Sequence, residues 1–150
     1  MGSLGGELMG KRSPAHVLWT EGPAAFSFLV DQHGFTGPHT IEPSGYTEHG
    51  GIRYERGKLS IEIDVWSGYG SDRGVTTTVW VRERSACAGL RALYVACGLG
   101  PERDVPEGGG SGHVVRKRIG EHSAALRKVV PHLVDVDPQA PVWTFLPFPV

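Results

Sequence analysis

The chain has 150 residues, a net charge of −1 and only two cysteines. This length corresponds to one domain that can bury a sizeable core without disulfides or metals. The nearly balanced charge gives no reason to expect nucleic acid or an anionic membrane surface as a partner. Because no stretch of about 18 apolar residues and no apolar signal region is present, we expect a cytoplasmic protein.

The predicted elements begin after residues 1–13, which are rich in glycine and polar side chains and are expected to form a flexible N-terminus. A single domain is expected over residues 14–150. Its first predicted helix begins at Gly22-Pro23 and ends at Gly34, which together with the apolar Phe35 matches a C-cap.

Residues 39–83 alternate apolar and polar side chains between turn signals, which predicts antiparallel strands. The clearest strands are "LSIEIDVW" (59–66) and the stretch starting "VTTTVWV" (75–81). The sequence Arg56-Gly57-Lys58 is a plausible tight connection from the preceding "GIRYE" segment. Three or four strands are expected here.

Two helices are expected in the second half of the chain, the first capped by Ser85 and the second running from Ser111 to near Pro131. A loop rich in glycine and proline separates them. The tail, about residues 133–150, is too rich in proline for regular structure, but its aromatic residues should dock on this domain or on a partner. The expected fold is α+β: an antiparallel meander sheet of three to five strands, with an N-terminal helix and two C-terminal helices packed on it.

The cysteines suggest no disulfide, because Cys87 and Cys97 lie ten residues apart in one predicted helix, about 15 Å along its axis. Both are interpreted as free thiols. Cys87, in the first turn of that helix, could be an activated nucleophile. Its alanine-rich surroundings favour a small buried residue instead.

No cofactor or metal is predicted. The seven histidines include no HExxH pattern and no pair at metal-ligand spacing. Gly68, Gly70 and Gly74 form GxGxxxG, which is one residue too long for the dinucleotide fingerprint and leads into a strand. The basic residues on the long helix could form a ridge that contacts phosphates, but they are also typical of a solvated helix face, which is the favoured interpretation.

The strands 59–66 and 75–82 are expected to pair and to present two different faces. The core face would hold Leu59, Ile61, Ile63, Val65, Val75, Val79 and Val81. The opposite face would hold Glu62, Asp64, Trp66, Thr76, Thr78, Trp80 and Arg82.

Tryptophan beside threonine and carboxylate is the composition of a protein-binding hot spot. Alternatively, the predicted first helix or the tail covers the tryptophans in a second apolar layer. Glu62 and Asp64 could also act as an acid-base pair, although alternating acids are typical of a solvated strand face.

A resemblance adds to this pattern. The segments "FSFLVDQHGF", "GIRYERGKLSIEIDVW", "TTVWV", "LRALYVACGLG" and "IGEHSAALRKVVPHL", over roughly residues 24–133, resemble small bacterial immunity-like proteins of polymorphic toxin systems. The resemblance implies a cytosolic, non-enzymatic protein that acts by binding another protein, and it implies no specific site residues.

The leading expectation is a protein-binding module, most concretely an immunity protein that neutralises a toxin by direct binding. Its partner-binding residues would be Glu62, Asp64, Trp66, Trp80 and Arg82. One alternative is a small-molecule-binding protein or enzyme with a site between the sheet and a covering segment. Another is a subunit of a larger assembly, with the apolar tail as an assembly arm. The oligomeric state stays open.

Overall fold

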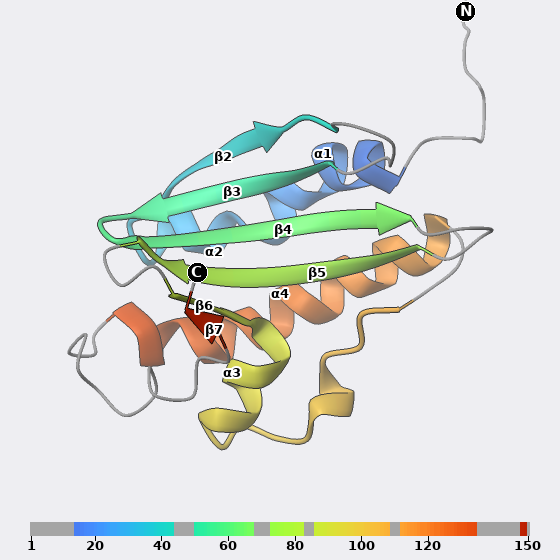
Figure 1. The fold of residues 1–150 in the computed structure, drawn as a ribbon. Coiled ribbons are helices and arrows are strands. Elements are labelled where there is room, and N and C mark those ends of the chain that lie inside the picture. The colour runs from blue at the N-terminus through green and yellow to red at the C-terminus, as the bar shows by residue number, and fades with distance from the viewer. Residues whose placement is uncertain are drawn as a thin grey trace, which may run out of the picture.

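A computed structural model describes residues 14–43, 50–67, 73–82, 86–108, 112–134 and 148–149. These residues form a layer of antiparallel sheet and a layer of helices (Figure 1). The expected α+β meander is confirmed, because strands β2 to β6 neighbour one another in chain order, with the two-residue β7 beside β6. The predicted flexible N-terminus and residues 135–147 of the tail lie outside the described residues.

The strands are β2 (Thr36–Ile41), β3 (Gly50–Arg56), β4 (Leu59–Ser67), β5 (Arg73–Val81), β6 (Ala86–Gly89) and β7 (Phe148–Pro149). The helices are α1 (Pro14–Ala25), α2 (Ser27–Asp31), α3 (Leu90–Ala96) and α4 (Gly112–Val134), with a 3-10 turn, η2 (Glu102–Asp104). The predicted tight connection is present between β3 and β4, where Gly57 has a φ of 57°, a conformation that favours glycine.

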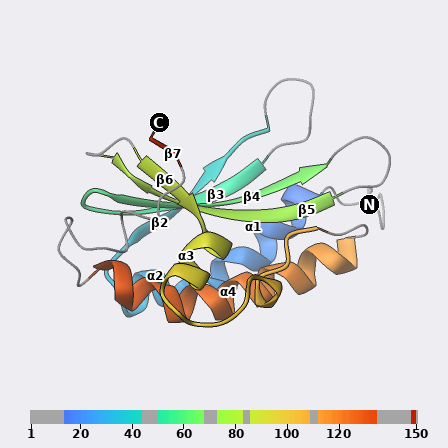
Figure 2. The same ribbon diagram turned by 60° about the horizontal axis from the view of Figure 1, so that its bottom comes forward.

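The helices lie on one face of the sheet, as Figure 2 shows. That face carries the aliphatic residues expected in the core: Ile61, Ile63, Val65, Val75 and Val79 are fully buried. Five residues of α3 and α4 lie in the same buried cluster: Leu90, Leu93, Ile119, Leu126 and Val130. The face assignment made from the alternating pattern is therefore correct.

The first helix begins much earlier than expected, at Pro14 instead of Gly22. Proline is favoured in the first turn of a helix because its missing N–H is not needed there. Gly22 instead lies inside α1, where a Cβ would come 2.9 Å from the Ile52 side chain, so the glycine lets the helix approach β3 closely. The segment predicted as one helix is divided at Phe26, because α1 ends at Ala25 and α2 runs from Ser27 to Asp31. The predicted glycine and apolar residue follow α2: Gly34 has a φ of 72° and the buried Phe35 donates its amide to the carbonyl of Leu29.

The expected second helix is shorter than its sequence suggested. Residues 86–89 form β6, which pairs with the end of β5, and α3 begins only at Leu90. Alanine and cysteine are tolerated in helices and in strands. Hydrogen-bonded pairing with β5 makes residues 86–89 a strand. Cys87 therefore lies on a strand and not in the first turn of a helix, and the two cysteines do not share a helix.

Two further boundaries differ from expectation. Helix α4 continues through Pro131 to Val134, three residues past its predicted stop. The tail contains a strand after all, because Phe148 pairs with Cys87 and Pro149 with Ala86. Proline is tolerated on an edge strand such as β7, since its missing N–H interrupts no inner ladder.

Candidate functional site

The five residues predicted to bind a partner lie on the face of the sheet opposite the helices. Strand register places Glu62 opposite Thr78 and Asp64 opposite Thr76, while Trp80 is opposite Ser60. Side chains two apart on a strand point to the same face. In the described part of the chain no helix lies over this face (Figure 2). We call it the open face: the outward residues of β3, β4 and β5, with Arg82 directly after β5.

A shallow hollow of about 270 Å³ lies on the open face. It is lined by Arg53, Glu55, Ser60, Glu62, Trp80 and Arg82. Three of the predicted residues are thus brought together in it. Asp64 and Trp66 lie farther along β4, outside the lining of the hollow.

The charged side chains of the hollow form a row of alternating sign. Glu55 lies between two arginines, 3.2 Å from Arg53 Nε and 3.5 Å from Arg82 Nη1. Arg53 also approaches Glu62 at 3.9 Å, and Arg82 donates a hydrogen bond to the carbonyl of Gly57. These side chains are 25 to 51% exposed. Because exposed ion pairs contribute about 0 to 1 kcal/mol each, the row is more useful for recognition than for stability.

Asp64 is an acid of the open face whose ionised form is disfavoured by its surroundings. Burial, together with the nearby negative charge of Glu62, raises the pKa of Asp64 to about 6. No ion pair joins its carboxylate to another described residue. A cationic group delivered by a partner would stabilise the ionised form.

Trp66 and Trp80 on the open face are both partly buried. This burial is intermediate between the exposed surface and the covered second apolar layer that the sequence analysis considered. Their indole nitrogens are buried and have no hydrogen-bond partner among the described residues. An unsatisfied buried donor is costly, about 1 to 3 kcal/mol, and calls for an explanation. The first helix does not cover them, contrary to one alternative, because α1 packs on the other face, where Trp19 and Ala15 lie against Gly50.

The cysteines and most histidines lie elsewhere. Cys87 and Cys97 are free and partly buried, and burial raises the pKa of the Cys97 thiol. Among the described residues, no group of three or more histidine, cysteine, aspartate or glutamate side chains could hold a metal ion. His122 is fully buried on the helix side of the sheet, where its Nδ1 lies 2.9 Å from Thr77 Oγ1.

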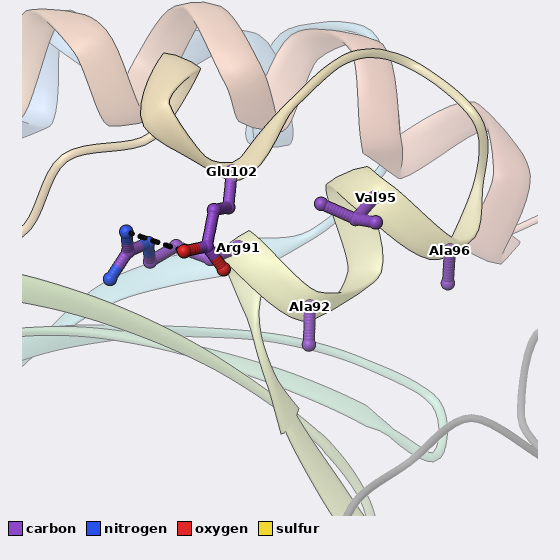
Figure 3. Close-up of a pocket in the computed structure, with 5 residues that line it drawn as sticks. All are labelled: Arg91, Ala92, Val95, Ala96 and Glu102. Atoms are coloured by element: carbon purple, nitrogen blue, oxygen red, sulfur yellow. Dashed lines mark ion pairs between the residues drawn. The ribbon is translucent and has the colours of Figure 1, made fainter.

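A second hollow, of about 560 Å³, lies beside α3 (Figure 3). It is lined by Arg91, Ala92, Val95, Ala96 and Glu102. Arg91 and Glu102 neutralise one another at 3.7 Å. The remaining described lining is aliphatic, so this hollow offers little for recognising or converting a small molecule.

Sequence reasoning missed Arg53, Glu55 and Ser60. A signal was available, because the predicted turn at Gly57 fixes the register of the β3–β4 hairpin. Arg53 pairs with Glu62 and Glu55 with Ser60 in that register. Extending the predicted face across the hairpin would have identified all three.

No protein-family model matches the chain, and neither a curated protein nor a solved structure matches it. None of the helices in the described residues is long and apolar enough to cross a membrane.

Proposed function

We propose that the protein is a protein-binding module that engages its partner through the open face. The observation that carries this proposal is Trp80, which lines the shallow hollow together with two arginines and two glutamates. Tryptophan and arginine are enriched among the residues that dominate the energy of protein interfaces. A broad, shallow surface suits another protein better than it suits a small molecule.

Three further features support binding at this face. The charged row is partly exposed and contributes little to stability, so its members are available for pairing with a partner. Asp64 would gain from a partner's cation. The unsatisfied indole N–H groups of Trp66 and Trp80 would gain from a carbonyl acceptor.

The narrower form of the proposal is that the partner is a toxin, which the protein neutralises in the cytoplasm by covering the toxin's active site. This form is supported only by the resemblance to immunity-like proteins. An enzymatic role has weaker support, since the described lining of neither hollow includes a histidine or a cysteine. No feature of the described residues favours an assembly subunit.

The test begins with the product of the neighbouring gene, co-expressed with this chain and purified as a complex. In the nuclear magnetic resonance spectrum, binding should shift the indole N–H signals of Trp66 and Trp80. The signal of Trp19, whose indole donates to the Gly51 carbonyl on the helix side, serves as the internal control. A complex that shifts only the Trp19 signal would contradict binding at the open face.

If the neighbouring product is not retained, the toxin version is left with the resemblance alone. The broader proposal is then tested with proteins retained from an extract of the native host, each purified and measured alone. A partner that inactivates host cells unless this chain is present would support the toxin version. A partner without such activity would leave only the binding module.

A further inference from the structure

Positive charge is concentrated in helix α4, which lies in the helix layer below the sheet (Figure 2). Counting histidine as neutral, α4 holds five basic and one acidic side chain, a net charge of +4. The rest of the chain holds ten basic and 15 acidic side chains, a net charge of −5. Glu121, the single acid of α4, is paired with Arg118 at 2.7 Å. The total charge near zero therefore hides a strongly basic helix.

Four of the basic side chains form two rows on the exposed side of α4. At about 100° per residue, positions eleven residues apart return to nearly the same side of a helix, about 16 Å along its axis. Arg116 and Arg127 form the arginine row, and Lys117 and Lys128 form the lysine row. All four residues are exposed. The two rows lie about 100° apart around the helix.

Only small or compact residues lie between the two rows. Gly120, Ala124 and Pro131 fall about 40 to 80° from Arg116, within the gap, and all three are exposed. We call these three residues the strip. A Cβ added at Gly120 would meet no atom of the described residues within 4 Å beyond the helix backbone itself. The strip is therefore open, and its small side chains allow another helix to approach closely.

The arginine row is held in place by α1 and α2. Arg116 donates from Nε to Glu21 of α1 at 2.8 Å. The guanidinium carbon of Arg127 lies over the ring of the buried Phe28 on α2, 4.3 Å from its centre. Arg127 pairs with no acid among the described residues, and a guanidinium that covers an aromatic ring keeps its N–H groups for a carboxylate. An anionic group would thus meet a side chain that is already positioned, at a lower cost in entropy.

The lysine row has no such support. Within the described part of the chain, Lys117 and Lys128 form neither a hydrogen bond nor an ion pair. Exposed lysines alone are typical of a solvated helix face. Here they lie across an open strip from a positioned arginine that lacks an acid, and this combination indicates a surface for carboxylates on both sides of the strip.

We propose that the exposed face of α4 is a second docking surface, which binds an acidic helix of a partner protein. Acids on both sides of that helix pair with the arginine row and the lysine row, while the two backbones approach over Gly120 and Ala124. This surface lies on the helix side of the sheet. It does not depend on the function proposed for the open face.

Charge and shape favour this occupant over three others. A second copy of α4 would bring like charges together. A membrane surface requires large apolar side chains beside the basic ones, whereas those of α4 are buried in the core: Val115, Ile119, Leu126, Val129 and Val130. A nucleic acid would extend beyond α4, towards parts of the chain that carry a net charge of −5.

The test is a nuclear magnetic resonance titration of the full chain with a synthetic peptide at about 20 mM salt. The peptide has about 20 residues, long enough to form a helix, with glutamates on both sides of a strip of alanines. The amide signals of Gly120 and Ala124 should shift, and the signal of Thr78 on the open face should not. A peptide of the same composition, with the glutamates spread around the helix, should bind about fivefold more weakly.

Two variants test the two rows and the strip separately. Lys117→Gln/Lys128→Gln removes the lysine row and should raise the dissociation constant of the first peptide about tenfold. Arg56→Gln/Arg103→Gln removes the same charge from two exposed positions outside α4, and should raise it less than about threefold. Gly120→Gln fills the strip at constant charge and should raise it about fivefold.

Four results would overturn the inference. The first is the absence of a shift at Gly120 in excess peptide. The second is equal weakening by the lysine and the arginine double variants, which would mean attraction to net charge alone. The third is wild-type affinity in Gly120→Gln, which would show that no helix packs on the strip. The fourth is tighter binding of a DNA duplex, or of vesicles that contain phosphatidylserine, than of the peptide.

Discussion

The carboxylate of Asp64 on β4 lies directly over Gly51, its partner residue on β3. A Cβ added at Gly51 would lie 2.5 Å from Asp64 Oδ1 and 2.6 Å from the carbonyl oxygen of Ile63. The side chain of Asp64 can rotate away, but the backbone carbonyl cannot. The glycine is therefore what allows this acid to lie flat on the sheet.

Gly51→Ala is accordingly expected to lower the free energy of unfolding by about 1 to 3 kcal/mol, as overpacked positions do. Gly120→Ala is the matched control. Gly120 lies on the exposed side of α4, with no atom within 4 Å of an added Cβ, so alanine there should stabilise the helix by up to about 1 kcal/mol. Denaturant unfolding of both variants measures the contrast, and equal effects would contradict the close approach.

Asp64→Asn is expected to stabilise the protein at about pH 8 but not at about pH 4. The pKa of Asp64 is raised from 3.8 to about 6 in the folded state, so folding favours the protonated form. Its contribution to stability is present below the unfolded pKa of 3.8 and is lost as the pH rises through about 6. Asparagine removes this loss.

The measurement is the difference in unfolding free energy between Asp64→Asn and the wild type at each pH, because that difference cancels other titrating groups. Asp31→Asn, on the exposed surface of α2, is the control for the loss of a carboxylate as such. A gain from Asp64→Asn that is the same at both pH values would show that burial does not disfavour the Asp64 charge.

The core assignment predicts that Ile63→Ala and Leu126→Ala each cost about 2 to 5 kcal/mol, since both side chains are fully buried. One lies on the sheet and the other on the helix packed against it. Val30, which is 39% exposed, is the control, with an expected cost below about 0.5 kcal/mol for Val30→Ala. Thermal or denaturant unfolding would refute the assignment if the two core variants matched Val30→Ala.

The pairing of β4 with β5 and the faces of both strands could be predicted because the side-chain alternation is unbroken over two long segments. The apolar face of α4 could be predicted in the same way, from the helical spacing of its apolar residues. Strand β6 could not be predicted from "ACAG", because small residues have no strong preference for strand or helix. The strand depends on its hydrogen-bonded pairing with β5. The start of α1 was misplaced because Gly22-Pro23 is a helix-start signal that lies inside the helix.

The candidate site was only partly predictable. The five predicted residues do share the open face, but Asp64 and Trp66 lie outside the hollow that contains Trp80. The position of residues 106–108 had no sequence signature, because their three backbone carbonyls meet donors from β5 and α4. Such contacts depend on the path of the backbone and not on the residue types of the segment.

The central claim, that the open face binds a protein, is tested most directly by the dissociation constant of the purified partner for Trp80→Ala and for Val95→Ala. Val95 is 48% exposed on α3, on the helix side of the sheet. Trp80→Ala should fold and weaken binding by about 2 kcal/mol or more, roughly thirtyfold, whereas Val95→Ala should bind like the wild type. A folded Trp80→Ala variant with the wild-type dissociation constant would contradict the account.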